Sequence, residues 1–142
     1  MTTTATRLEF SLPAVPASVR KARVSVAETV TELGASERVV DDVRLCVSEA
    51  VSNVVRHAYG NGWGDVDVVV EREEGALNVV VRDFGQGIGP KSSRRKTNGG
   101  YGLKIIEKVA ERLHITSARA DGTEVRMVFL LAGGTPGGAP PS

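Results

Sequence analysis

Two valine-rich runs near the middle of the chain constrain the fold more than any other feature. Residues 65–73 (DVDVVVERE) and 76–84 (ALNVVVRDF) carry apolar side chains at every second position, which is the period of a half-buried β-strand. A short connection at EGA joins the two runs, and a joint this tight favours an antiparallel hairpin. The sequence therefore predicts a sheet whose neighbouring strands run in opposite directions.

One strand and two amphipathic helices are predicted before this hairpin. Apolar residues alternate in RLEFSLPA (7–14), Ser18 is expected to cap a helix that ends near Gly34, and a second helix should run from about Ser36 to Ala58. In both helices apolar residues recur at spacings of three and four: Val19, Ala22, Val26, Val30 and Leu33, then Val43, Val47, Ala50, Val51, Val54 and Ala58. One stripe of each helix should thus face a core.

A long connection and a third helix follow the hairpin. From Gly85 to Gly102 the chain holds six glycines and almost nothing apolar, and so long a connection in a small domain is usually functional or disordered. GLKIIEKVAERL (102–113) has helical spacing with Leu113 as its last apolar residue. HITSA and TEVRMVFLL around a turn at ADG predict a second hairpin.

These elements predict an α+β fold: a two-layer α/β sandwich with a mixed, mostly antiparallel sheet that helices cover on one face. A chain of 142 residues is long enough for one domain with its own core. We expect that domain to span residues 1–131. The glycine- and proline-rich tail, residues 132–142, is expected to be disordered.

Composition excludes several classes of function. The net charge is +1, so no global attraction to nucleic acid or to an anionic membrane is expected. The single cysteine, Cys46, excludes an internal disulfide and a cysteine-rich zinc site, and its place among helical residues favours a buried side chain over a reactive thiol. No apolar run approaches the roughly 18 residues that span a bilayer. A cytoplasmic location is expected.

Three polar or glycine-rich clusters are candidates for chemistry. Glu49 and Asn53 lie one helical turn apart on the second helix, Asp83 begins the run DFGQGIG, and the glycines of GGYGL precede the third helix. Glycines at a helix start let a ligand approach the backbone, and the exposed amides favour phosphate. Each cluster alone is ambiguous, and neither a Walker loop nor the companion motifs of a protein kinase are present.

Together and in this order, the three clusters resemble the N, G1 and G2 boxes of the GHKL ATPase superfamily. EAVSNVVRHAY, RDFGQGIG and GGYGLKIIEKVAE are similar to anti-sigma factor serine kinases of the RsbW type, over roughly residues 8–131. The resemblance implies an ATP-binding α/β sandwich with a mobile lid. The segment that corresponds to the lid carries a basic cluster, which could be a solvated loop or could meet phosphate or an acidic partner: Lys91, Arg94, Arg95 and Lys96.

The resemblance also implies a role for individual residues. Glu49 corresponds to the general base, Asn53 to the Mg²⁺ ligand and Asp83 to the acceptor for the adenine amino group. The remaining positions implied to bind ATP are Gly85 and Gly87 near the base, Gly100, Gly102 and Leu103 at the phosphates, and Thr123 near the adenine. His57 and Tyr59 are expected to orient the helix end and not to react.

The implied activity is ATP-dependent phosphorylation of a serine on an anti-anti-sigma protein with a STAS domain, combined with sequestration of a sigma factor. A homodimer is a family expectation. Two alternatives share the same site residues: a non-catalytic module in which ATP only organises a protein-binding surface, and a switch kinase that activates a partner phosphatase. A detached histidine-kinase catalytic domain is disfavoured because no dimerisation helix with a phosphorylatable histidine precedes the fold.

Overall fold

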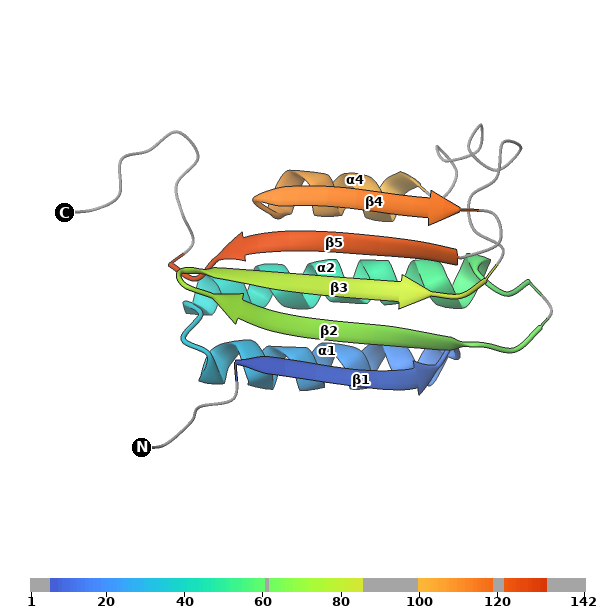
Figure 1. The fold of residues 1–142 in the computed structure, drawn as a ribbon, viewed down its shortest axis with the longest axis horizontal. Helices are drawn as coiled ribbons and strands as arrows, with labels where there is room; N and C mark the ends of the chain where they lie inside the picture. Colours follow the sequence, from blue (N-terminus) through green and yellow to red (C-terminus); the bar gives the residue numbers. More distant parts are fainter. Residues whose placement is uncertain (1–5, 61, 86–99, 119–121, 133–142) are drawn as a thin grey trace.

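A five-stranded sheet is the framework of the molecule, in a computed structural model that describes residues 6–60, 62–85, 100–118 and 122–132. The strand order is β1-β2-β3-β5-β4 (Figure 1). Each neighbouring pair is antiparallel, so the sheet is antiparallel throughout and not mixed. The strands are β1 (Arg7–Pro13), β2 (Asp65–Glu73), β3 (Ala76–Asp83), β4 (Arg112–Ala118) and β5 (Gly122–Leu130).

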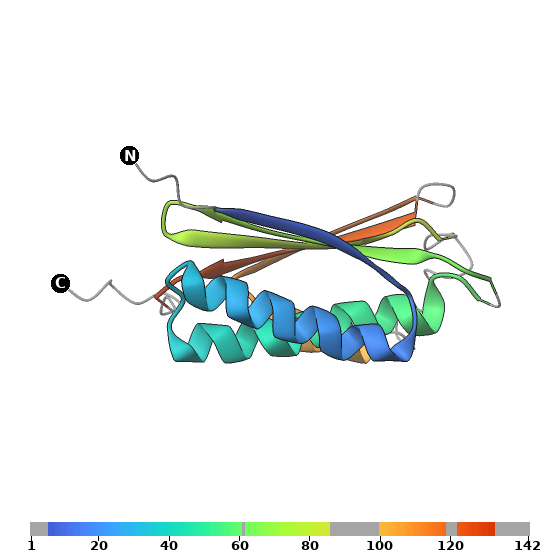
Figure 2. The same cartoon turned by 90° about the horizontal axis from the view of Figure 1, so that it is seen from below.

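Three described helices cover one face of this sheet, which confirms the two-layer sandwich (Figure 2). They are α1 (Pro16–Glu32), α2 (Glu37–His57) and α4 (Gly100–Val109). Helix α2 contacts both of the others. Within the described residues, no helix combines the length and the apolar character that crossing a bilayer requires.

Helix α2 begins and ends where its sequence signals predict, and α1 does not. The Ser36 hydroxyl accepts a hydrogen bond from the amide of Val39 (3.2 Å) and caps α2. Helix α1 begins at Pro16, and Ser18, the predicted cap, is buried inside the first turn. Proline fits this first position because its φ is already helical, and because an amide hydrogen there would have no partner within the helix. Gly34, with φ +103°, follows the end of α1 as expected.

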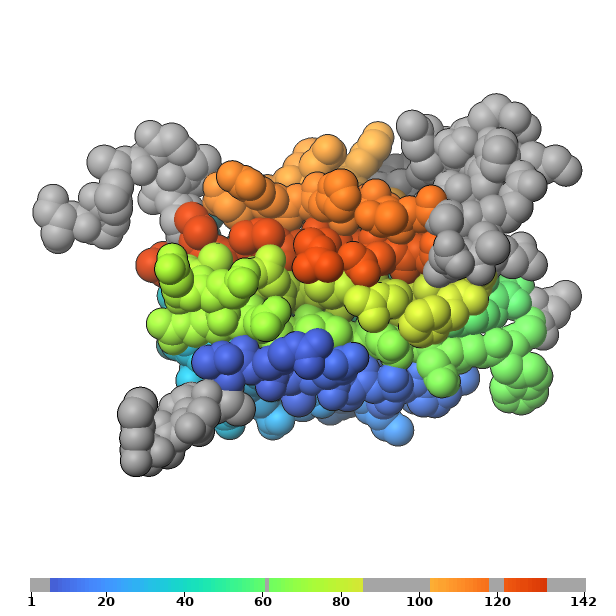
Figure 3. All heavy atoms as spheres, in the orientation of Figure 1, coloured from blue at the N-terminus to red at the C-terminus, as the bar shows by residue number. Residues whose placement is uncertain are grey.

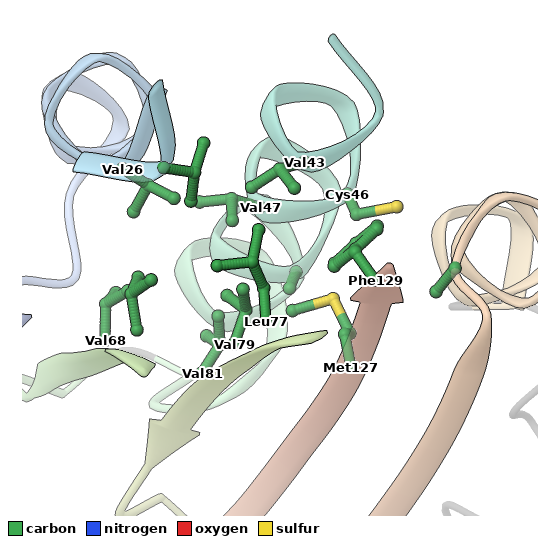
Figure 4. Close-up of a cluster of buried hydrophobic side chains, with 14 of the residues drawn as sticks. Val26, Val43, Cys46, Val47, Val68, Leu77, Val79, Val81, Met127 and Phe129 are labelled. Carbon is green, nitrogen blue, oxygen red and sulfur yellow. The ribbon is translucent and has the colours of Figure 1, made fainter. Parts of the chain in front are cut away.

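The core fills the space between the helices and the sheet. Valine, leucine and methionine side chains from β2, β3 and β5 meet the apolar stripes of α1 and α2, and Cys46 lies among them (Figure 4). Cys46 is 0% exposed, which confirms the prediction of a buried side chain. The alternating apolar side chains of the strands and the apolar stripes of α1 and α2 therefore pack together in one layer.

The third helix is shorter at its C-terminus than its apolar spacing predicts. Helix α4 ends at Val109, and Leu113 belongs to β4 and not to the helix. The amide of Glu111 donates to the carbonyl of Val128 (2.8 Å), and Leu113 pairs with Met127 across the β4–β5 register. Pairing with a distant strand thus overrides local helical spacing. Residues 119–121, which include most of the predicted ADG turn, and residues 133–142 of the predicted tail lie outside the described residues.

No described element covers the opposite face of the sheet (Figure 3), where polar and charged side chains surround the paired valines Val69 and Val80. On this face Glu124 accepts from both Arg82 and Arg126, each at 3.1 Å. Ser11 donates to Asp67 from the neighbouring strand. This polar network explains why charged residues alternate with valines along the strands.

Several chain segments meet at one end of the sandwich. The end of β1 pairs with the start of β2 (Pro13 with Asp65), and the end of β3 pairs with the start of β5 (Asp83 with Thr123). The last turn of α2 and the first turn of α4 lie at the same end (Figure 1). We call this the Asp83 end. The three predicted boxes all contribute residues to it.

Candidate functional site

Asp83 is a buried carboxylate at the end of β3. It is 5% exposed, and its Oδ1 accepts hydrogen bonds from the amides of Gly85 (2.9 Å) and Thr123 (3.3 Å). Burial raises the pKa of Asp83, and the two amide bonds oppose that rise. Among the described residues no donor reaches Oδ2. Asp83 therefore keeps one acceptor for a donor group on a ligand.

Glycines bring the backbone close to Asp83 from two sides. A Cβ at Gly85 would lie 2.0 Å from the carbonyl oxygen of Ala58, and one at Gly122 would lie 2.1 Å from the carbonyl oxygen of Asp83. Gly122 also has φ +82°, a conformation that side chains disfavour. Sequence reasoning placed Gly85 in the site and missed Gly122, which it counted only as part of a turn. The Asp-Gly pair at the start of a predicted strand was the available signal.

Glu49 and Asn53 are half-buried on α2, one turn apart, as predicted. The Asn53 carbonyl oxygen Oδ1 accepts a hydrogen bond from Nη2 of Arg56 (3.1 Å), an exposed side chain one turn further on. Glu49 contributes a negative charge close to Cys46, because it is one of the two carboxylates that raise the pKa of that thiol. The polar face of α2 thus presents a carboxylate and an amide oxygen near the Asp83 end.

The donor set at this end fits a magnesium ion that arrives with a phosphate group. Mg²⁺ is usually held by one or two protein oxygens, and waters and substrate phosphates complete its shell. Asn53 offers one such oxygen, and its partner Arg56 is exposed and can move away. The described residues contain no group of three or more His, Cys, Asp or Glu side chains that could bind a metal without phosphate. Asn53 could therefore supply one oxygen ligand to such an ion.

The start of α4 supplies backbone amides to the same end. The helix begins at Gly100, so Gly102 lies within its first turn and not before it. Leu103 is half-buried and packs against the core, which anchors this turn to the sandwich. Unpaired amides in the first turn of a helix favour phosphate. Residues 86–99 lie outside the described residues, and they include Gly87 and the basic cluster of the predicted lid at residues 91–96.

Thr123 contacts Asp83, whereas His57 lies exposed at the end of α2. The Thr123 amide donates to Asp83, and its hydroxyl lies 3.0 Å from the hydroxyl of Ser117, so β5 is tied to the buried carboxylate. His57 is the last residue of α2 and is exposed. The described residues give His57 no hydrogen-bond partner.

Cys46 should react slowly with thiol reagents in the native protein. Burial, with the nearby charges of Asp42 and Glu49, raises the pKa of its thiol to about 12, and only the thiolate is nucleophilic. We expect labelling by a thiol-specific disulfide reagent at pH 8 to be slower than in the urea-unfolded chain by more than about tenfold. Stopped-flow absorbance would measure both rates. Equal rates would show that α2 opens readily.

Comparisons with known proteins identify relatives of this chain. The family model described as "Histidine kinase-like ATPase domain" matches residues 12–129. The anti-sigma F factor of Clostridium acetobutylicum is 32% identical over 115 residues, covering 75% of this chain and 80% of the relative. The serine-protein kinase RsbW of Bacillus velezensis is 29% identical over 147 residues, covering 94% and 91%.

A solved structure resembles this chain in both sequence and fold. The crystal structure of the RsbU and RsbW domains of a Mycobacterium tuberculosis protein superposes with a TM-score of 0.70 and 25% identity. The match covers 88% of this chain and 32% of that chain, so this chain spans about a third of it. The chain therefore belongs to the family of histidine kinase-like ATPase domains, in the GHKL superfamily and among the anti-sigma factors and serine-protein kinases of the RsbW type.

Proposed function

We propose that this chain is an ATP-dependent serine-protein kinase that also acts as an anti-sigma factor. It would phosphorylate a serine on an anti-anti-sigma protein of the STAS-domain class and, with nucleotide bound, sequester a sigma factor. The observation that carries the proposal is the meeting of Asp83, the end of α2 and the start of α4 at one end of the sandwich. Relatives that bear the names of both activities support it.

Nucleotide recognition would begin at Asp83. Its free acceptor, Oδ2, suits the amino group of adenine, whereas guanine presents a carbonyl oxygen at the equivalent position and would be repelled. The first turn of α4 would hold the phosphates through its backbone amides. Asn53 would hold the magnesium ion through Oδ1 after Arg56 has moved away. A bound magnesium ion would neutralise part of the negative charge of the phosphate oxygens.

Glu49 would act as the base in phosphoryl transfer. Its carboxylate is half-buried on the face of α2 that also carries Asn53, and it would accept the proton of the attacking serine hydroxyl. Transfer of this kind depends mostly on the placement of the two reactants and on electrostatic stabilisation. The carboxylate therefore has to be ionised and within reach of the hydroxyl when the partner docks.

Partner capture followed by a transfer assay tests this function. A tagged chain would be used to capture proteins from its native cell, first with Mg-ATP and then with Mg-ADP. We expect a sigma factor in the ATP sample, and we also expect to capture a STAS-domain protein. That protein should gain phosphoserine, detected by mass spectrometry, when it is incubated with the chain and Mg-ATP. A chain that binds the sigma factor but never transfers phosphate would be a non-catalytic module instead.

A further inference from the structure

Tyr59 joins two loops at the Asp83 end with a single hydroxyl group. It follows Ala58, the C-cap residue of α2. Its hydroxyl donates a hydrogen bond to the carbonyl of Asp65 (2.6 Å) and accepts one from the amide of Phe84 (2.9 Å). The start of β2 and the turn after β3 are thereby held to the end of α2.

The ring of Tyr59 lies against the loop that precedes β2. A Cβ at Gly64 would lie 2.1 Å from ring atoms Cε1 and Cζ, so the ring rests directly on the Gly64 backbone. The carbonyl of Gly64 in turn accepts from the amide of Ala14 (2.9 Å), which ties this loop to the end of β1. Any side chain at position 64 would push the ring, and the hydroxyl with it, out of place.

The turn that Tyr59 holds is the one that orients Asp83. Phe84 donates to Tyr59, and the next amide, Gly85, donates to Oδ1 of Asp83. Gly85 is also in close contact with the carbonyl of Ala58. Two neighbouring amides therefore link the end of α2 to the Asp83 carboxylate, and a shift of the Phe84 amide would move the Gly85 amide as well.

We propose that Tyr59 is a positioning residue for adenine selection: its hydroxyl fixes the Phe84–Gly85 turn and so directs the open oxygen of Asp83 toward the base. This inference rests on the proposed binding of ATP at the Asp83 end. Burial, the largest cause, raises the pKa of Tyr59, and the charges of Asp83 and Asp65 add to the rise. The hydroxyl therefore stays protonated near neutral pH and keeps its bond to Asp65.

The substitution Tyr59→Phe tests this role because it keeps the ring and removes only the hydroxyl. We expect the dissociation constant for ATP to rise by about 5- to 10-fold, and the preference for ATP over GTP to fall by a similar factor. Both constants would be measured by isothermal titration calorimetry with the nucleotides alone. Where transfer is observed, KM for ATP should rise and kcat should change by less than about twofold.

Thr31→Val is the matched control. It removes a hydroxyl whose hydrogen bond to the carbonyl of Ala27 (2.8 Å) lies in the last turns of α1, away from the Asp83 end. The affinity and the selectivity should therefore both stay at wild-type values.

Two measurements on the nucleotide-free protein would report whether the turn loosens. The Phe84 amide should exchange faster with solvent in Tyr59→Phe than in wild type, measured by NMR. The sole tryptophan, Trp63, lies one residue before Gly64 and is 93% exposed, so its fluorescence anisotropy would report loosening of that loop.

The possible failures are distinct. If Tyr59→Phe lowers the melting temperature but binds ATP and GTP with wild-type constants, Tyr59 is merely structural and the inference is wrong. If wild type itself does not prefer ATP to GTP, the role of Asp83 fails and this inference fails with it. Absence of phosphoserine on any partner, with ATP preference intact and lost in Tyr59→Phe, would contradict only the proposed kinase activity.

Discussion

Replacing Asp83 with asparagine should weaken ATP binding by about 10- to 100-fold while the protein stays folded. The asparagine oxygen can still accept from the amides of Gly85 and Thr123, which are the two bonds that Asp83 makes through Oδ1. The second position changes from an acceptor to an NH₂ donor, which would face the donor group of adenine. Titration calorimetry with ATP would measure the loss, and circular dichroism would confirm the fold.

The pH dependence of the same residue gives a second readout. The pKa of Asp83 is higher in the folded protein than in the unfolded chain because burial disfavours the charge. The cost in stability is therefore complete above the folded-state pKa, shrinks as the pH falls through that value, and is gone below the unfolded-state pKa, where Asp83 is protonated in both states. The uncharged asparagine variant should thus be at least as stable as wild type at pH 7.

The affinity for ATP should also depend on pH. As the pH falls, wild-type protein should lose affinity when Asp83 takes up its proton, and this happens at a higher pH than it would for an aspartate with an ordinary pKa. Asp83→Asn should show no such loss.

Asp67→Asn is the control for both measurements. Asp67 lies on β2 near the same end, but it faces the polar side of the sheet, where it accepts from Ser11. Its substitution should leave ATP affinity unchanged at every pH. An Asp83→Asn protein that binds ATP as tightly as wild type would remove Asp83 from the adenine site.

The elements whose signals are local were predictable from the sequence. Helix α2 runs from the Ser36 cap to Ala58 as its pattern indicates, because capping and helical period depend on residues only three or four positions apart. The hairpin of β2 and β3 was also predictable, because the alternation of apolar residues and the tight turn between the strands are likewise local signals. The misassignments at Ser18 and Leu113 arose where a neighbouring proline or a distant strand determined the boundary.

The interior of the candidate site was less predictable because its contacts join segments far apart in the chain. The bond from Thr123 to Asp83 spans 40 residues, and the bond from Phe84 to Tyr59 spans 25. No spacing rule indicates that Gly122 must lie against the Asp83 carbonyl, or that Gly64 must lie under a tyrosine ring. The resemblance to a family supplied the proposed ligand-binding positions, and the structure added the residues that contact those positions.

Glu49→Gln should lower the rate of phosphoryl transfer by about 100- to 10,000-fold, the range usually lost with a general base. Glutamine has nearly the same shape but cannot accept the serine proton. ATP affinity should change by less than about threefold, because Asp83 and the first turn of α4, which would hold the nucleotide, are untouched. Single-turnover transfer to the captured STAS-domain partner would measure the rate, and calorimetry would measure the affinity.

Asp42→Asn is a closely matched control for this substitution. Asp42 is also half-buried on α2 and also raises the pKa of Cys46, but it lies two turns, or about 10 Å, further from the Asp83 end. Both variants should therefore lower the pKa of the Cys46 thiol, which shows that a charge has been removed near the cysteine in each. Only Glu49→Gln should lose transfer. Equal transfer by the two variants would assign the proton to another acceptor and leave Glu49 with an electrostatic role alone.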